Sequence, residues 1–255
     1  MRSFSPASLH SRQSNGCINP NPANNITQRL NNALSSSGTG FILHLCPNTQ
    51  YMITAPILFA APNQEISTEG YPTDSSRATL VVSGSVSNGK GHTTAVDGTC
   101  SNCFGITLRN IQVSSSHFVS RSTGFLICVQ INGNRAGAPP TAGGANIEMG
   151  GGNSNQLIEY VHSYDPRSWS CLHVAEGNFL CNNVTVQHND IGPCGSDAFM
   201  EWADGISVSC RSTVVRNNVV TDSTDGGIVL FGSPGSSVYN NTVQAFDVSQ
   251  SHCMA

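Results

Sequence analysis

Four acidic side chains in the last third of the chain could carry acid–base chemistry. Asp197, Glu201 and Asp204 lie within eight residues of one another, and Asp225 follows one repeat later. Asp204 and Asp225 each precede a Gly and a strand-like run, so we expect them to open equivalent strands, roughly 4.8 Å apart. Retaining glycosidases hold their two carboxyl groups about 5–5.5 Å apart, and inverting ones about 6.5–9.5 Å. The pattern predicts Asp204 and Asp225 as an acid/base pair, assisted by Glu201 or Asp197. Side chains that only cap Asp-Gly turns are the alternative.

Aromatic, basic and acidic residues stand close to these candidate catalytic groups. His173 and Glu176 belong to a strand-like run one repeat earlier, and Arg167 and Trp169 directly precede it. Trp202 places the second of the two tryptophans of the chain beside the acids. An indole next to carboxylates commonly holds a sugar ring by stacking on its apolar face. We therefore expect these five residues to bind substrate; tryptophans that only cover the edge of the strands are the alternative.

Metal-assisted elimination is the second chemistry that the residues allow. Carboxylates would then bind Ca²⁺, and a Lys or Arg would remove the C5 proton of a sugar. The single lysine, Lys90, is far from the acids in sequence, so Arg167 and Arg211 are the nearest bases. Outside this alternative we expect no cofactor. Zinc does not fit, because Cys100 and Cys103 have no second cysteine pair at zinc spacing; these two residues predict a small disulfide loop rather than a redox motif.

Three similar runs indicate the elements that position these groups. Residues 186–191, 215–220 and 238–243 have apolar ends and an Asn in the same central place. A repeat of 20–30 residues built on a β-type run is typical of a solenoid. Alternation at period two predicts that each run is a strand. The aligned Asn189, Asn218 and Asn241 should form a ladder in which each amide binds the next.

A second column of strands and one helix complete the predicted architecture. The column comprises residues 171–174, 205–208 and 227–230, which alternate with the Asn-containing runs. Residues 23–34 place Ile26, Leu30 and Leu34 at helical spacing, and Gly38 ends this helix. A helix ahead of stacked strands would cover their open apolar end. We predict an all-β fold, a parallel β-helix of roughly eight coils with a short N-terminal capping helix.

The domain organisation follows from the same pattern. Residues 1–22 are polar and predict a flexible lead-in, residues 23–245 form a single β-helix domain, and residues 246–255 form an irregular tail. No capping element follows the last repeat, so we expect this tail to be non-native or the chain to be truncated. A solenoid of this kind is expected to be a monomer.

Composition and cysteine content indicate the compartment and exclude several partners. The chain has ten cysteines and Asn-X-Thr acceptor sites at Asn25, Asn183 and Asn240, which favour a secreted glycoprotein. A formal net charge of −4 provides no basic surface for nucleic acid. No apolar stretch reaches membrane-spanning length, and the N-terminus carries no visible signal peptide. Spacing does not fix the disulfide connectivity, but Cys17–Cys46 and Cys181–Cys210 are candidate pairs; the second would hold the loop at residues 192–203.

Several stretches resemble right-handed parallel β-helix proteins of the pectin-lyase-like superfamily, in particular a group of uncharacterised secreted fungal proteins. They are residues 33–57, 63–74, 202–207 and 224–236, and the resemblance covers most of residues 23–245. It implies a right-handed parallel β-helix and an action on polysaccharides by hydrolysis, elimination or epimerisation, or binding alone. The Asn-Thr-Asp, Asp-Asp, Gly-His-Gly and Arg-Ile-Lys motifs of polygalacturonase-type glycosidases are not found, which argues against pectin hydrolysis.

These observations predict a secreted carbohydrate-active protein that hydrolyses glycosidic bonds of a plant or fungal cell-wall polysaccharide. A metal-assisted polysaccharide lyase is the first alternative, and it would release unsaturated, ultraviolet-absorbing products. A non-catalytic wall-binding or structural β-helix protein is the second, and its binding would survive replacement of the catalytic carboxylates. In each case the expected partner is a polysaccharide or oligosaccharide, with no nucleic acid and no membrane.

Overall fold

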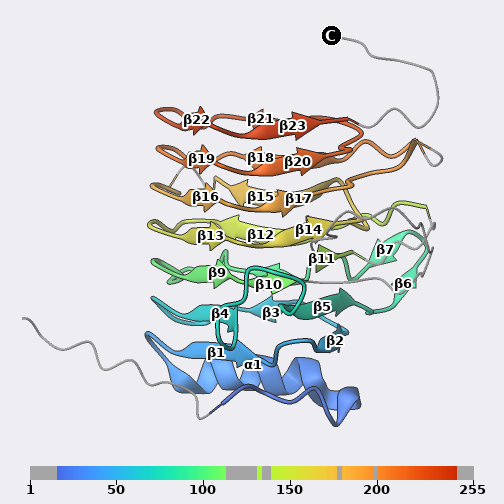
Figure 1. The fold of residues 1–255 in the computed structure, drawn as a ribbon, viewed down its shortest axis with the longest axis vertical. Coiled ribbons are helices and arrows are strands. Elements are labelled where there is room, and N and C mark those ends of the chain that lie inside the picture. The colour runs from blue at the N-terminus through green and yellow to red at the C-terminus, as the bar shows by residue number, and fades with distance from the viewer. Residues whose placement is uncertain (1–15, 113–130, 134–138, 177–179, 198–199, 246–255) are drawn as a thin grey trace, which may run out of the picture.

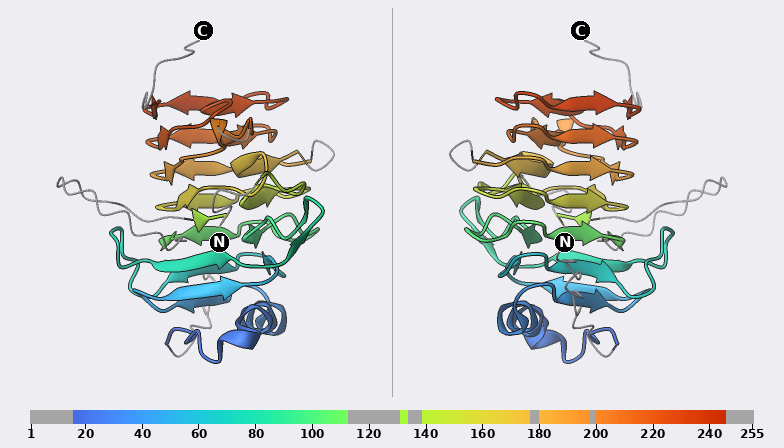
Figure 2. Two further views of the ribbon diagram at one scale, coloured as in Figure 1. Left: turned by 90° about the vertical axis from the view of Figure 1, so that its right-hand side faces the viewer. Right: turned by 90° about the vertical axis from the view of Figure 1, so that its left-hand side faces the viewer.

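The computed structural model describes residues 16–112, 131–133, 139–176, 180–197 and 200–245. Within these residues, short strands pair in parallel into three long sheets, and one helix lies at the N-terminal end (Figure 1). The side views show the coils stacked one on the next (Figure 2). This arrangement fits a β-solenoid, as the repeat predicts. Residues 1–15 of the predicted lead-in and the predicted tail at 246–255 lie outside the described residues.

Each sheet is built from strands that occupy the same place in successive coils. Sheet A contains β1 (Ile42–Leu45), β4 (Glu65–Thr68), β9 (Thr107–Arg109), β13 (Leu157–Glu159), β16 (Thr185–Gln187), β19 (Val214–Arg216) and β22 (Ser237–Tyr239). Sheet B contains β2 (Gln50–Ile53), β5 (Ala78–Val82), β10 (Ile111–Gln112), β11 (Ile131–Asn132), β14 (His162–Tyr164), β17 (Asp190–Ile191), β20 (Val219–Thr221) and β23 (Thr242–Gln244). Sheet C contains β3 (Ile57–Leu58), β8 (Val96–Asp97), β12 (Ile147–Gly150), β15 (Ser170–Ala175), β18 (Asp204–Val208) and β21 (Ile228–Leu230). A separate antiparallel hairpin joins β6 (Val86–Ser87) to β7 (Lys90–Gly91).

Each of the three similar runs contains two strands, so the prediction of one strand per run is wrong. The run at 186–191 begins in β16 of sheet A and ends in β17 of sheet B, and the other two runs divide in the same way. The residue at each division has a positive φ: 55° at His188, 54° at Asn217 and 54° at Asn240. One residue in this conformation turns the chain sharply between two extended segments. Alternation of apolar residues does not reveal such a bend.

The predicted asparagine ladder is confirmed. The side-chain amide of Asn189 donates to Oδ1 of Asn218 at 2.9 Å, and that of Asn218 donates to Oδ1 of Asn241 at 2.9 Å. Each accepting Oδ1 also binds the backbone N–H of the preceding rung at 3.0 Å. Asn189 and Asn218 are each 1% exposed. These bonds satisfy buried polar groups at the bend between sheets A and B, which would otherwise be costly.

The core runs along the axis of the stack. On sheet A, one inward position of each strand is aligned with the same position of the next strand, and from β1 to β19 these side chains are all 0% exposed. They are Leu43, Ile66, Leu108, Ile158, Val186 and Val215. Full burial of such a side chain contributes about 1.5–3 kcal/mol. Apolar stacking therefore holds successive coils together.

The predicted capping helix is confirmed. A 3₁₀ turn, η1 (Ala23–Asn25), leads into α1 (Ile26–Ser37), which ends at Gly38 with a φ of 74°. Leu30 and Leu34 are both 0% exposed and belong to the core. The Asn31 side chain donates to the carbonyl of Pro56 at 2.9 Å and accepts the N–H of Leu58 at 2.8 Å. The helix thus covers the apolar end and satisfies backbone groups at the free edge of β3.

A row of polar side chains ties the outer face of sheet A together. Arg109 lies 3.5 Å from a carboxylate oxygen of Glu159, and Gln187 donates to the other oxygen at 2.7 Å. Arg216 donates to Oε1 of Gln187 at 2.9 Å and to the Tyr239 hydroxyl at 3.3 Å. Their alignment follows from the strand register. Both signs of charge alternate with neutral groups, so this face is electrically balanced.

Four disulfides lie within the described residues, and three of them join neighbouring turns. Cys17–Cys46 and Cys181–Cys210 have the predicted connectivity, and Cys100–Cys103 closes the predicted small loop. The fourth, Cys171–Cys194, was not expected. It holds the start of the loop at 192–203, a role that the sequence assigned to Cys181–Cys210. The assignment was wrong because Cys181 and Cys210 follow β15 and β18, whereas the loop precedes β18.

Candidate functional site

The outer face of sheet C brings an acid and an imidazole into direct contact. The register pairs Glu148 of β12 with His173 of β15. Nδ1 of His173 lies 2.7 Å from Oε2 of Glu148, and the two side chains are 15% and 16% exposed. Glu148 Oε1 accepts the backbone N–H of Ala145 at 2.7 Å. With Nδ1 occupied by the carboxylate, Nε2 of His173 is the nitrogen available for proton exchange on this face.

An indole lies against this pair. The rings of Trp169 and His173 meet edge to face, with centroids 4.8 Å apart and an interplanar angle of 67°. Trp169 is 38% exposed, so part of its surface stays in contact with solvent. The sequence predicted both residues as substrate-binding, and the structure brings them together. Such an arrangement offers an apolar surface for a sugar ring beside an acid–base pair.

Asp204 lies on the next strand of the same sheet. Its Oδ2 accepts the hydroxyl of Ser207 at 2.6 Å, and its Oδ1 accepts the N–H of Gly226 at 3.0 Å. Ser207 is aligned with His173, and its Oγ is also 3.3 Å from Oγ of Ser170. Two donors therefore hold the carboxylate of Asp204 in one orientation, one coil beyond the imidazole.

Asp225 is not equivalent to Asp204, so that prediction is wrong by one residue. The strands β18 and β21 align Ile206 with Ile228, which places Asp204 opposite Gly226. Asp225 instead donates its N–H, at 3.2 Å, to the carbonyl of the residue before Asp204. A shift of one residue moves a side chain to the other face of a strand. The two Asp-Gly pairs are identical in sequence, but the strand register decides which side chains become neighbours.

The two assisting acids have different surroundings. Asp197 is exposed in the loop at 192–203, and its carbonyl accepts the N–H of Met200 at 3.0 Å. Glu201 is 5% exposed, and its backbone forms an antiparallel bridge with Ser196. Its carbonyl accepts the hydroxyl of Thr224 at 2.6 Å. The loop thus holds Glu201 inside the protein rather than at its surface.

Trp202 and Glu176 lie at opposite ends of the sheet C strands. Trp202 precedes β18 and is 65% exposed, on the same side as Trp169, whose carbonyl accepts the N–H of Asp204 at 2.9 Å. Glu176 follows β15, and its carbonyl accepts the N–H of Cys181 at 3.2 Å. Trp202 can therefore extend the aromatic surface near Trp169, whereas Glu176 is separated from it by the length of β15.

Arg167 is placed differently from the prediction. Its guanidinium donates to the carbonyls of Val82 at 3.1 Å, Gly84 at 2.7 Å and His92 at 3.0 Å. Arg167 is 8% exposed, and this burial lowers the pKa of its guanidinium from the ordinary value. These bonds hold the base of the β6–β7 hairpin. We therefore assign Arg167 to the support of that hairpin rather than to substrate binding.

Sequence reasoning missed Glu148 and Ser207. Glu148 lies in a four-residue strand after a Gly- and Pro-rich stretch, where the repeat is hard to follow. Ser207 looked like an ordinary polar residue of the second strand column. Alignment of the short run at 147–150 with the column at 171–174 would have revealed both, because the register places Glu148, His173 and Ser207 in one row.

No family model, curated protein or solved structure matches this chain. In the part of the chain that the structure describes, no helix is long and apolar enough to cross a membrane. The same described residues contain no group of three or more His, Cys, Asp or Glu side chains placed to hold a metal ion. The candidate site therefore has to be interpreted from its own geometry.

Proposed function

We propose that this chain is a secreted, right-handed β-helix protein of the pectin-lyase-like type that binds a cell-wall polysaccharide on sheet C and hydrolyses its glycosidic bonds. The observation that carries this proposal is the row formed by Glu148, His173 and Ser207 with the attached Asp204. It combines two oriented carboxylates, an imidazole and, in Trp169, an exposed indole. The four disulfides support an extracellular location.

The strand register places Glu148 and the residue that holds Asp204 further apart than the two carboxylates of a retaining enzyme. Ser207, which holds Asp204, is two strands away from Glu148 along the row. Two strand spacings between Glu148 and Ser207 amount to about 9–10 Å, which exceeds the gap of about 5–5.5 Å in retaining glycosidases and is nearer to the range of about 6.5–9.5 Å in inverting ones. A gap of this size leaves room for a water molecule on one side of the sugar.

The roles follow from the partners of each carboxylate. Asp204, oriented by Ser207 and Gly226, accepts a proton from the attacking water as its oxygen bonds to the anomeric carbon. His173, whose Nδ1 is held by Glu148, delivers a proton from its Nε2 to the departing glycosidic oxygen as the old bond breaks. Trp169 stacks on the ring and fixes its position.

The charge of the face limits the substrate. The six strands of sheet C contain Asp97, Glu148 and Asp204 but no Lys or Arg. A uronic-acid polymer would find no cation for its carboxylates and would be repelled by these acids. Neutral or amino-sugar polymers fit the face better.

A panel of neutral, amino-sugar and uronic-acid polysaccharides tests this proposal. Reducing-end and ultraviolet assays are run in parallel on the wild-type protein and on Glu148→Gln and Asp204→Asn. Hydrolysis predicts new reducing ends without ultraviolet absorbance, and a loss of about 10²–10⁴-fold in each variant. Glu159→Gln, which removes an acid from sheet A, is the matched control and should keep its activity. Ca²⁺-dependent ultraviolet absorbance would instead support the lyase alternative.

One observation favours the non-catalytic alternative. Both oxygens of Asp204 already accept hydrogen bonds within the protein, as expected of a carboxylate that only caps a turn. A binding protein would retain affinity for its glycan in Asp204→Asn and would show no turnover on any member of the panel. Circular dichroism of each variant separates lost activity from lost folding.

A further inference from the structure

The disulfide between Cys100 and Cys103 differs in kind from the other three. Its cysteines are three residues apart, whereas Cys17–Cys46, Cys171–Cys194 and Cys181–Cys210 span 29, 23 and 29 residues. Those three bonds close loops as long as a coil, whereas Cys100–Cys103 closes only its own turn. The entropy that a disulfide removes from the unfolded chain grows with the length of the loop. Cys100–Cys103 therefore contributes least to stability.

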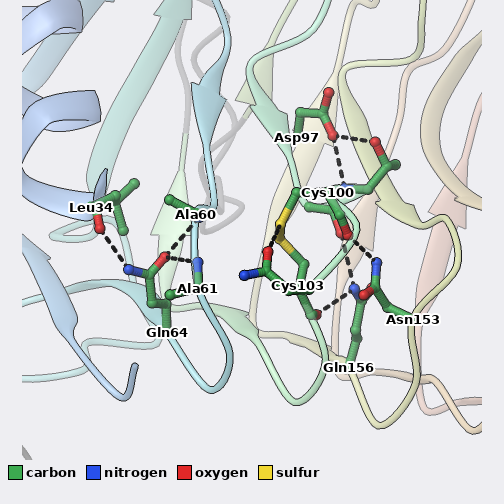
Figure 3. Close-up of a disulfide and its surroundings, with 12 residues drawn as sticks. Leu34, Ala60, Ala61, Gln64, Asp97, Cys100, Cys103, Asn153 and Gln156 are labelled. Carbon is green, nitrogen blue, oxygen red and sulfur yellow. Dashed lines mark hydrogen bonds between the residues drawn. A yellow bond between two sulfur atoms is a disulfide. The ribbon is translucent and has the colours of Figure 1, made fainter. Parts of the chain in front are cut away.

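Hydrogen bonds hold the same turn independently of the disulfide (Figure 3). The N–H of Cys103 donates to the carbonyl of Cys100 at 3.2 Å. From the next coil, the side chain of Asn153 donates to the carbonyl of Cys100 at 2.6 Å, and that of Gln156 donates to the carbonyl of Cys103 at 2.9 Å. Both amides are buried, at 4% and 1% exposure. Breakage of the S–S bond would leave all three hydrogen bonds in place.

The two cysteines differ in exposure. Cys103 is 0% exposed and packs in the core, whereas Cys100 is partly exposed and is followed by the exposed Ser101 and Asn102. The amide oxygen of Asn102 lies 3.3 Å from Sγ of Cys100. In the reduced state the Cys100 S–H can donate to this oxygen, a bond that the disulfide form cannot make. An incoming thiolate therefore reaches Cys100, and Cys103 is the leaving group.

The sequence predicted only a structural loop here, but on the hydrogen bonds and exposure of this turn we propose that Cys100–Cys103 is a reversible redox site that exchanges with small thiols such as glutathione. A thiolate attacks Sγ of Cys100, the S–S bond breaks, and Cys103 leaves as a thiolate that takes up a proton. A second small thiol then attacks the mixed disulfide at the sulfur that came from the first small thiol. This releases the Cys100 thiolate and forms the oxidised disulfide of the two small thiols. Two electrons pass from two thiols to the protein, and excess oxidised thiol reverses the sequence. This site is independent of the chemistry proposed for sheet C.

Graded reduction of the native protein tests the proposal. The full chain is incubated with increasing glutathione, free thiols are alkylated, and peptides are identified by mass spectrometry. Cys100 and Cys103 should be labelled at the lowest thiol concentrations, while the three coil-spanning disulfides remain protected and the circular dichroism is unchanged. In Cys103→Ser, oxidised glutathione should form a mixed disulfide with the free Cys100 thiol and release one molecule of reduced glutathione. Labelling of all pairs together, or only after unfolding, would overturn the proposal.

A matched pair of double variants checks the structural part of the argument. Cys100→Ser/Cys103→Ser should fold with a Tm within about 3 °C of wild type, because the hydrogen bonds of the turn remain. Cys181→Ser/Cys210→Ser removes a coil-spanning bond and should lower Tm by roughly 5–10 °C. An equal loss in both variants, or failure of the first to fold, contradicts the proposal.

Discussion

Two short hydrogen bonds organise the candidate site at the level of single residues. The 2.7 Å contact between Glu148 and His173 and the 2.6 Å contact between Asp204 and Ser207 lie on neighbouring strands of one sheet. Each carboxylate also accepts a backbone N–H, from Ala145 or Gly226. Side chains held by second partners lose little freedom when substrate binds, which favours catalysis.

His92 gives the protein a pH-dependent contact outside this site. Its Nδ1 accepts the N–H of Gly84 at 3.2 Å, and its Nε2 lies 2.8 Å from the carbonyl of Thr94. Burial lowers the pKa of this imidazole below its ordinary value of 6.5; the carbonyl of Thr94 opposes the shift, and the charge of Arg167 adds to it. The neutral ring is thus the form that fits. Protonation at Nδ1 would break the bond to Gly84.

We predict an acid-dependent loss of stability from His92. A lowered folded-state pKa contributes stability that is present above about pH 6.5 and is lost as the pH falls toward the folded-state pKa. The free energy of unfolding, measured by urea denaturation at about pH 7.5 and about pH 5.5, should fall more for the wild type than for His92→Gln. Equal losses in the two proteins would show that His92 does not titrate in this way.

At the level of elements, the repeat predicted more of the fold than of the site. The strand columns, the capping helix and the asparagine ladder follow from patterns of apolar spacing and aligned amides, and these are visible in the sequence. The neighbours of Asp204 are not visible there, because they depend on the exact length of each coil. The spacing of Asp204 and Asp225 differs from the structural repeat by one residue, enough to separate them.

The bend at the end of these sheet A strands explains why the prediction of one strand per run was wrong. His188, Asn217 and Asn240 adopt positive φ, and the chain turns there into sheet B. Asn accepts this conformation more readily than most residues, so Asn-Asn pairs were a signal for the bend. The ladder residue directly follows each of these positions, which explains why it lies inside the turn rather than on a face of a sheet.

We predict that Asn218→Ala destabilises the fold by about 2–4 kcal/mol. Asn218 is 1% exposed, and its side chain binds both Asn189 and Asn241. Alanine would leave buried donors and acceptors of two coils without partners. Urea denaturation measures the loss. The same substitution at the exposed Asn32 of α1 is the matched control and should change stability by less than about 0.5 kcal/mol.

At the level of the whole molecule, the faces of the stack differ in charge. On sheet A, Arg109 and Arg216 alternate with Glu159 and neutral side chains, whereas sheet C carries acids without any Lys or Arg in its strands. The net charge of −4 does not reveal this division. A linear polymer aligned with the axis would meet a different set of groups on each face.

This division predicts selectivity among glycans. Affinity electrophoresis at low ionic strength should show retardation by a neutral or amino-sugar polymer and none by polygalacturonate, because the acids of sheet C repel its carboxylates. Asp97→Asn should weaken the preference for the amino sugar, and added salt should do the same. Glu159→Gln, which removes an acid from sheet A instead of sheet C, is the control and should leave the preference unchanged. Tight binding of polygalacturonate would contradict the charge argument.

The stereochemistry of the product tests the central claim most directly. If Asp204 activates a water molecule while the Glu148–His173 pair protonates the leaving oxygen, water attacks the anomeric carbon from the side opposite the leaving group. Proton NMR of the first product released from an active substrate should then show the inverted anomeric configuration, and Glu148→Gln should abolish its formation. A product of retained configuration, or an unsaturated one, would contradict the account.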